Sequence, residues 1–198
     1  IGIGGVGVGV VEMLTRCGLG KIIIYDFDTI ELANMNKMFY RPEQSGWNKT
    51  MACRHYCSEL NPDVSFEVHN MNICSEENRS KFKDTLASGS IDRKEAVSMI
   101  VGCVDNLEAR QLMEQMSEEL QVPFMDAVVS DDAMGGSVQL IIPGRTGGLE
   151  AAPIKSHMEK RPGQCPASLP TTDSILSGIT AQNILKYLLG FGEVAFLL

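Results

Sequence analysis

The first thirty residues of the chain constrain its fold more than any other stretch. They contain the pattern Gly2-x-Gly4-x-x-Gly7, then an amphipathic run, then a short apolar segment that ends at Asp26. This order predicts the end of a strand, a glycine turn, a helix and a second strand. A glycine turn at a helix N-terminus brings unpaired N–H groups close to a phosphate, and a carboxylate at the tip of the next strand can bind ribose hydroxyls. The stretch therefore predicts a nucleotide site.

The glycine motif does not by itself say which nucleotide binds. The same pattern fits NAD, FAD, ATP or S-adenosylmethionine, and a glycine-rich turn can also serve only the close packing of a helix on a strand. The surrounding order of strand, turn, helix, strand and acid favours a nucleotide site. The chemistry done on the nucleotide has to be inferred from residues elsewhere in the chain.

Strands and helices are expected to alternate along most of the sequence. The expected strands are 64–68, 96–101 and 123–129, and the expected helices are 51–60, about 75–86, 107–120 and about 172–189. Residues 135–144 look like an antiparallel strand added at the edge of the sheet, and 191–198 begin a last strand. This pattern predicts a Rossmann-like α/β fold, a doubly wound and mostly parallel sheet with antiparallel edge strands.

Net charge and cysteine usage exclude several classes of function. The formal net charge is −8 over 198 residues, which argues against a nucleic-acid partner because phosphate binding needs an excess of lysine and arginine. No apolar run approaches the roughly 20 residues that span a bilayer, so no membrane partner is expected. Six cysteines without a Cys-x-x-Cys pair favour a reduced, cytoplasmic setting. Cys53 and Cys57, with His55 between them, could hold a metal, but packed helix cysteines are the commoner explanation.

Polar side chains that follow the predicted strands should converge at one edge of the sheet. They are Asp26, the segment 34–37, Lys49 and the pair Asp105-Asn106. Hydride transfer does not need two lysines and a second carboxylate around the phosphates, whereas adenylation does. When a carboxylate attacks the α-phosphate of ATP, Lys37 and Lys49 can stabilise the developing charge, and Asp105 can hold Mg²⁺.

Each of these residues also has an ordinary structural explanation. An isolated lysine is usually solvated surface charge. A binding role is favoured for Lys37 and Lys49 because both are expected in non-helical stretches beside strand ends. Asp and Asn are preferred helix N-caps, so one residue of the pair Asp105-Asn106 could cap the following helix while the other binds a ligand.

Several blocks of sequence resemble a family of ATP-dependent enzymes. They are EMLTRCG at 12–18, ELANMN at 31–36, NPDV at 61–64, CVDN at 103–106 with EAR at 108–110, QLIIPG at 139–144 and CPASLPTT at 165–172. In this order they resemble the activating enzymes of ubiquitin-like modifiers, which have relatives in bacterial molybdopterin and thiamine synthesis. Within that family the resemblance is greatest to the branch that acts on ubiquitin-fold modifier 1. It covers almost the entire chain.

The resemblance implies roles for individual residues in binding ATP. Gly5 would lie against the phosphates, Asp26 would bind the ribose and Asp105 would hold Mg²⁺. Lys37 would stabilise the charge that develops during adenylation. Further contacts with ATP are expected from Gly4, Asn34, Lys49, Asn72 and Asn106.

Cys165 is expected to be the nucleophile. Once the C-terminal carboxylate of the modifier is adenylated, the Cys165 thiolate would attack the acyl-adenylate and give a thioester and AMP. Lys160, Arg161 and the N-terminus of the following helix favour a thiolate at this position. A packed structural cysteine is the expectation for the other five. Cys165, Lys37 and Asp105 therefore form the expected catalytic set.

The resemblance also implies how the chain is divided and what it meets. A single domain is expected, with an ATP-binding adenylation core at 1–144, a mobile crossover loop carrying Cys165 at 145–171, and a helix and strand returning to the core at 172–198. The implied partners are a ubiquitin-like modifier, a conjugating enzyme and a second copy of the chain in a homodimer.

Two features depart from the family pattern. Lys37 stands where the family usually has an arginine, which keeps the charge but loses the bidentate fork. The family's structural zinc would need cysteines at the positions of Gly148 and Ala151 and a second pair beyond Leu198. The chain as written therefore cannot bind zinc in the family's way.

Three other functions compete with modifier activation. The chain could adenylate a sulfur-carrier protein without an obligatory thioester, or it could be a non-catalytic scaffold partner of an activating enzyme. A nicotinamide-dependent dehydrogenase is the third. The sequence does not identify the modifier.

Overall fold

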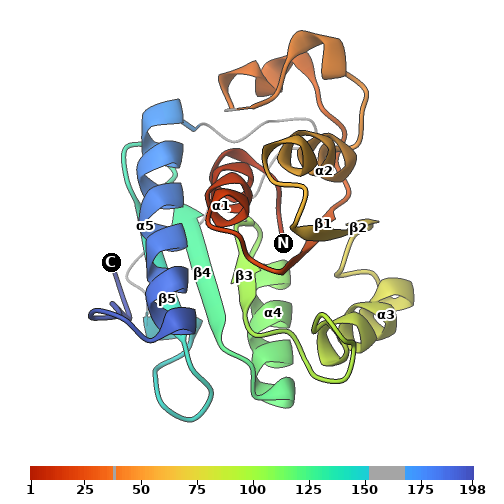
Figure 1. Ribbon diagram of the computed structural model, residues 1–198. Helices are drawn as coiled ribbons and strands as arrows, with labels where there is room; N and C mark the ends of the chain where they lie inside the picture. The colour runs from red at the N-terminus through yellow and green to blue at the C-terminus, as the bar shows by residue number, and fades with distance from the viewer. Residues whose placement is uncertain (38, 152–167) are drawn as a thin grey trace.

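The computed structural model describes residues 1–37, 39–151 and 168–198 (Figure 1). Helices and strands alternate along the chain as α1, β1, α2, β2, α3, β3, α4, β4, β5 and α5. The helices are α1 (Gly5–Arg16), α2 (Lys49–Leu60), α3 (Glu76–Ala87), α4 (Leu107–Leu120) and α5 (Pro170–Leu189). The strands are β1 (Lys21–Asp26), β2 (Ser65–Asn70), β3 (Ile100–Gly102), β4 (Phe124–Val129) and β5 (Gly136–Ile141). Short 3₁₀ turns span Leu32–Asn36, Pro42–Gln44 and Leu149–Ala151.

The strands form two hydrogen-bonded groups that residues 1–3 join. β1 pairs in parallel with β2, β3 pairs in parallel with β4, and β5 pairs antiparallel with β4. Gly2 N donates to Tyr25 O at 2.9 Å, and Cys103 N donates to Ile1 O at 2.9 Å, so residues 1–3 lie between β1 and the end of β3. The order across the layer is β2, β1, residues 1–3, β3, β4, β5. The predicted Rossmann-like fold with an antiparallel edge is confirmed.

Helices cover both faces of this layer, which makes the fold doubly wound (Figure 1). On one face α1, α2 and α5 share an apolar core that includes Val8, Leu14, Ile24, Cys57, Leu140 and Ile184. On the other face α3 and α4 share a second core that includes Phe82, Leu112, Met113, Met116 and Phe124. The apolar periodicity of each helix explains which side it buries.

Glycines let α1 approach its neighbours closely. A Cβ atom at Gly7 would collide with Gly2 O, and one at Gly9 would lie 2.5 Å from Ser177 Oγ on α5. Ser177 Oγ also donates to Val6 O at 2.8 Å. The glycines of the motif therefore serve helix packing as well as the turn itself, and they fix where the N-terminus of α1 lies.

Three predicted element boundaries are wrong. β3 spans Ile100–Gly102 instead of 96–101. Its parallel partner β4 begins only at Phe124, because the residue before it, Pro123, has no N–H with which to extend the ladder. α2 begins at Lys49, so Lys49 is a helical residue, not part of an irregular stretch. Of the predicted last strand 191–198, only 196–198 pair with β5: Leu198 exchanges backbone hydrogen bonds with Val138, and Leu140 N donates to Phe196 O at 2.9 Å.

No helix within the described ranges has the length and apolar character that would let it cross a membrane.

Candidate nucleotide site at the glycine turn

Asp26 is held directly against the glycine turn. Its Oδ2 accepts a hydrogen bond from Ile3 N at 2.7 Å, and its Oδ1 accepts one from Asp28 N at 2.8 Å. Each carboxylate oxygen retains a second lone pair, so ribose hydroxyls can still donate to it. The predicted closeness of Asp26 to the turn is confirmed, and backbone N–H groups fix its orientation.

The turn itself presents an open helix N-terminus. Gly4 is the N-cap residue of α1, and no side chain caps the first turn. A Cβ atom built on Gly4 would meet no atom within 4 Å, so open space borders the turn here. Unpaired first-turn N–H groups and the positive end of the helix dipole favour an anion at this place.

Lys49 lies beside the same turn through its contact with the loop after β1. Its Nζ is 2.7 Å from Asp28 Oδ2, and its backbone N donates to Asp28 O at 3.0 Å. The side chain is 11% exposed, so it is packed and not freely solvated. As the first residue of α2 it is placed by the helix, which gives it a fixed position that the sequence pattern did not indicate.

Lys37 reaches the glycine turn from the 3₁₀ segment Leu32–Asn36. It follows that segment as its C-terminal cap residue and is buried, with its Nζ 3.8 Å from Asp173 Oδ2 on α5. A Cβ atom on Gly5 would collide with the same Asp173 carboxylate. Lys37, Gly5 and Asp173 therefore lie together at the N-terminus of α1.

Sequence reasoning missed Asp173. The sequence shows it only as an acidic residue near the start of a helix, which is a common position for helix stabilisation. Its neighbours at the turn come from the first forty residues, so only the folded chain brings them together.

Asp105 lies at the same edge of the sheet. It is exposed and follows β3, and the preceding segment contacts the turn: a Cβ atom on Gly2 would lie 2.7 Å from Cys103 O. Within the described ranges no three or more His, Cys, Asp or Glu side chains gather as a metal cluster. Asp105 could therefore hold Mg²⁺ only together with other oxygen ligands such as substrate phosphates.

Three asparagines in the predicted site use their amide oxygens for local structure. Asn34 Oδ1 accepts from Glu31 N at 2.9 Å, and Asn72 Oδ1 accepts from Cys74 N at 2.9 Å. Asn106 Oδ1 accepts from Ala109 N at 2.8 Å and so caps α4. Of the pair Asp105-Asn106, the second is the cap, and the first is left as the candidate ligand.

Cys165, the predicted nucleophile, lies outside the described residues. Of the predicted crossover loop, 145–151 and 168–171 are described. Leu149 N donates to Glu114 Oε1 at 2.8 Å, and Gln139 Nε2 donates to Gly148 O at 2.8 Å. The segment that carries Gly148 and Ala151, at the family's zinc-ligand positions, is therefore fastened to α4 and β5 by hydrogen bonds.

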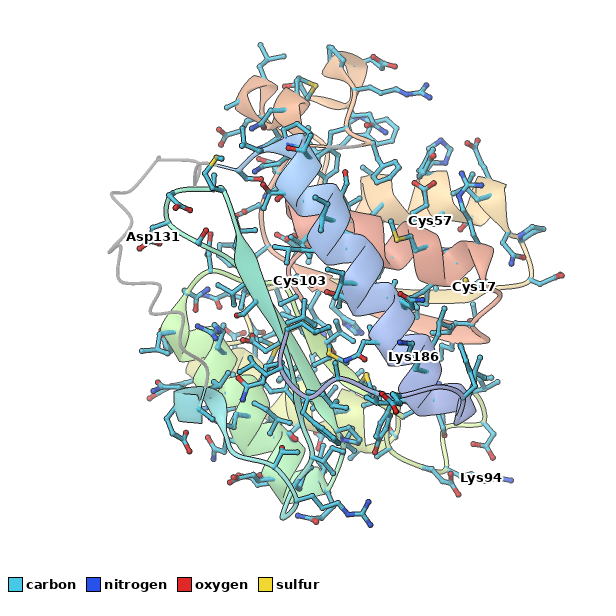
Figure 2. All side chains as sticks on the ribbon, turned by 90° about the vertical axis from the view of Figure 1, so that its left-hand side faces the viewer. Cys17, Cys57, Lys94, Cys103, Asp131 and Lys186 are labelled. Carbon is cyan, nitrogen blue, oxygen red and sulfur yellow. The ribbon has the colours of Figure 1, made fainter. Side chains whose placement is uncertain are left out.

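The other five cysteines are all free thiols. Cys53 and Cys57 are buried in the α1/α2 core, as the structural expectation had it. Burial raises the pKa of the Cys103 thiol to about 11, so it is a poor nucleophile at neutral pH. Cys17 differs from the expectation because it is exposed; Figure 2 shows it at the far end of α1, away from Cys103 near the middle of the fold.

A second buried charge pair, between Arg110 and Asp126, was not predicted from the sequence. Arg110 on α4 donates to Asp126 on β4, with Nη2 2.6 Å from Oδ2 and Nε 3.2 Å from both carboxylate oxygens. Burial raises the pKa of Asp126 above its ordinary value, and the bonds from Arg110 oppose that rise. The pair fastens α4, the helix that follows Asp105, to β4.

An apolar cavity of about 510 Å³ is lined in part by residues 1–3 and by Gly7 of the glycine motif. The cavity lies between β1 and residues 97–101, and its lining includes Leu14, Leu86 and Ile184. None of the predicted site lysines, asparagines or carboxylates borders it. The candidate site is the glycine turn and not this cavity.

Comparison with known proteins gives one matching family and a set of similar chains. The model described as "ThiF family" matches residues 1–197. Ubiquitin-like modifier-activating enzyme 5 of Dictyostelium discoideum is 48% identical over 205 residues, covering 100% of this chain and 54% of that protein. The Arabidopsis thaliana protein of the same name is 44% identical over 206 residues, covering 98% of this chain and 48% of that protein. The chain thus spans about half the length of the curated relatives it matches.

Solved structures agree with the fold. A crystal structure of E. coli MccB with ATP has a TM-score of 0.78 at 20% identity, and the match covers 100% of this chain and 57% of that one. A crystal structure of MccB with succinimide has a TM-score of 0.79 at 21% identity, covering 99% of this chain and 56% of that one.

Proposed function

The chain belongs to the ThiF family, and from that premise we propose that it activates a ubiquitin-like modifier in an ATP-dependent reaction. The C-terminal carboxylate of the modifier attacks the α-phosphate of ATP and gives an acyl-adenylate and pyrophosphate. The thiolate of Cys165 then attacks the acyl carbon, so AMP leaves and the modifier remains as a thioester. The observation that carries the proposal is the closeness of Asp26 and Lys37 to the open N-terminus of α1.

The residues at this edge fit an ATP molecule. The uncapped first turn of α1 and the open space at Gly4 let phosphate oxygens approach backbone N–H groups. Lys37 and Lys49 supply cations on two sides of the turn, where negative charge develops during adenylation. Asp26 accepts the ribose hydroxyls while Ile3 N and Asp28 N hold it in place.

Asp105 is the residue assigned to hold Mg²⁺. In sites of this kind Mg²⁺ is bound by one or two carboxylates together with substrate phosphates, and a single exposed carboxylate beside the turn meets that requirement. When bound, the ion neutralises charge on the phosphate oxygens. The chain holds Asp105 just after the end of β3, and Asn106 is the residue that caps α4.

The partners are proposed for the whole protein. The sequence blocks described above make ubiquitin-fold modifier 1 the first candidate modifier, with a conjugating enzyme as acceptor of the thioester and a second copy of the chain as dimer partner. The names of the similar proteins support a ubiquitin-like modifier as substrate. The free cysteines among the described residues are consistent with the proposed reduced, cytoplasmic setting.

Pyrophosphate exchange tests the adenylation step. The purified protein is incubated with ATP, Mg²⁺ and labelled pyrophosphate, together with one member of a panel of purified ubiquitin-like proteins that includes ubiquitin-fold modifier 1. Label should enter ATP only with the correct modifier. Exchange with none of them would contradict the proposal and favour a scaffold role, and binding of NAD without ATP would favour a dehydrogenase.

The thioester step is tested by changing Cys165→Ala. This variant should keep pyrophosphate exchange and lose the modifier adduct seen on a non-reducing gel. Cys17→Ala is the matched control, because Cys17 is an exposed free thiol away from the glycine turn and its loss should leave the adduct unchanged. An adduct that survives Cys165→Ala would indicate an adenylating enzyme without this thioester.

A further inference from the structure

A buried carboxylate lies at the phosphate-binding end of α1, and the proposed reaction gives it no role. Asp173 belongs to the first turn of α5, and its side chain is 1% exposed. The carboxylate lies so close to the first residue of α1 that a Cβ atom on Gly5 would collide with it. The N-termini of α1 and α5 therefore meet at this one acidic side chain.

Several groups surround the carboxylate of Asp173. The side chain is within the first turn of its own helix and beside the first turn of α1, and a helix N-terminus stabilises an anion. The Ser168 hydroxyl donates a hydrogen bond to its Oδ2. Lys37 provides the opposite charge. Asp173 thus lies beside the open N-terminus of α1, with Lys37 as the nearby opposite charge.

The contact between Lys37 and Asp173 is electrostatic and is not a hydrogen bond. Nζ and Oδ2 are 3.8 Å apart, whereas a charge-assisted hydrogen bond has a length of about 2.7–2.9 Å. An ammonium group has three donors, and Lys37 is 7% exposed, so little water is available to it. A phosphate oxygen could therefore accept a hydrogen bond from Lys37 without breaking one to Asp173.

We propose that Asp173 is an internal competitor of the nucleotide: its carboxylate lies beside the open N-terminus of α1 and repels the phosphates of ATP. The inference rests on the proposed function, because it supposes that ATP binds at the glycine turn. Two negative groups at one site repel each other, so the opposition grows with the charge of the phosphate chain. The same repulsion favours the departure of pyrophosphate after the adenylate has formed. Asp173 thus determines how tightly nucleotides of different charge are held.

The test is the change Asp173→Asn, which removes the charge and keeps the shape. Binding of ATP, ADP, AMP and adenosine to the purified protein is measured by isothermal titration calorimetry with Mg²⁺ present. The variant should bind ATP about tenfold more tightly than the wild type, ADP by a smaller factor, and adenosine with unchanged affinity. The dependence on phosphate charge is what distinguishes competition from a change in folding.

Asp84→Asn is the matched control, since it removes one carboxylate from the exposed side of α3, which packs on the opposite face of the sheet. It should leave all four affinities unchanged. An equal gain in both variants, or an unchanged or weaker affinity for ATP in Asp173→Asn, would overturn the proposal. If the wild type itself binds no ATP, the proposed function fails, and that result is seen before any variant is compared.

A second variant covers the case in which Asp173→Asn does not fold. Ser168→Ala removes the hydroxyl that holds the Asp173 carboxylate beside the N-terminus of α1. The competitor is then held less firmly, so ATP affinity should rise by a smaller factor while adenosine affinity stays the same. No rise in ATP affinity with this folded variant would contradict the inference.

Discussion

Two ion pairs in this chain are equally buried and differ in geometry. In Arg110–Asp126 and in Lys37–Asp173 alike, the side chain of the cation is 6% exposed and that of the carboxylate 1%. Arg110 Nη2 lies 2.6 Å from Asp126 Oδ2, with Nε in reach of both oxygens. Lys37 Nζ lies 3.8 Å from Asp173 Oδ2. The two pairs are therefore buried to the same extent, but only Arg110 and Asp126 are joined by hydrogen bonds.

This difference distinguishes an ion pair that serves the structure from one whose cation can bind a different anion. Removing charges from water costs several kcal/mol per ion, and only a short, well-bonded contact offsets that cost. Arg110 and Asp126 make such a contact, which offsets part of that cost and fastens α4 to β4. Lys37 does not use its donors on Asp173, so they are available for another anion at the glycine turn.

The largest expected effect comes from breaking the tight pair. Arg110→Met should lower the free energy of unfolding by about 3–5 kcal/mol, because it leaves Asp126 buried and without its partner. Lys37→Met should cost only about 1 kcal/mol, because the Ser168 hydroxyl and two helix N-termini still stabilise Asp173. Urea unfolding of both variants measures the two losses, and equal losses would remove the distinction between the pairs.

An intermediate effect is expected where Asp173 contacts Gly5. Gly5→Ala should destabilise the protein by about 1–3 kcal/mol, since the new methyl group would overlap the Asp173 carboxylate. In an Asp173→Ala background the same change should cost almost nothing. Thermal and urea unfolding of the four proteins in this double-mutant cycle give the coupling.

Gly178→Ala on α5 is the control for that cycle. A Cβ atom at Gly178 would meet no atom within 4 Å, so this change should stabilise the helix by about 0.5–1 kcal/mol. A Gly5→Ala cost that persists without the Asp173 carboxylate would show that the two residues are not in contact.

The smallest effect is the pH dependence of the tight pair. Burial raises the pKa of Asp126 in the folded protein above its ordinary value of 3.8, despite the bonds from Arg110. The folded state therefore binds this proton more tightly than the unfolded state does. The stability that results is fully present below pH 3.8 and is lost as pH rises through the folded-state pKa.

Urea unfolding of the wild type and of Asp126→Asn over that pH range isolates this contribution. The wild type should lose stability relative to the variant as pH rises. A relative gain would mean that the bonds from Arg110 outweigh burial, and the pKa would then be lowered instead.

Features set by neighbouring residues were predictable from the sequence. The glycine turn, α1 and β1 follow one another within thirty residues, and the closeness of Asp26 to the turn follows from that order. Asn106 was foreseen as one of two possible caps for α4, and the structure identifies it as the cap. Local chemistry decides each of these features, so the sequence carries them.

The Lys37–Asp173 pair was not predictable, because distant segments bring its members together. Lys37 and Asp173 come from the start and the end of the chain, and each alone resembles a surface charge. Lys49 was expected in an irregular stretch, but it begins α2 and is held by Asp28. The role of Cys165 stays a prediction, since the residue lies outside the described ranges.

Residues 1–3 connect the glycine turn to both halves of the sheet. They form a seam in the sheet. The backbone hydrogen bonds of Gly2 and Ile1 join the half-sheet of β1 and β2 to the half-sheet of β3, β4 and β5. The turn that would grip phosphate leads directly out of this seam. A change in the distance between the two half-sheets would therefore displace the glycine turn as well.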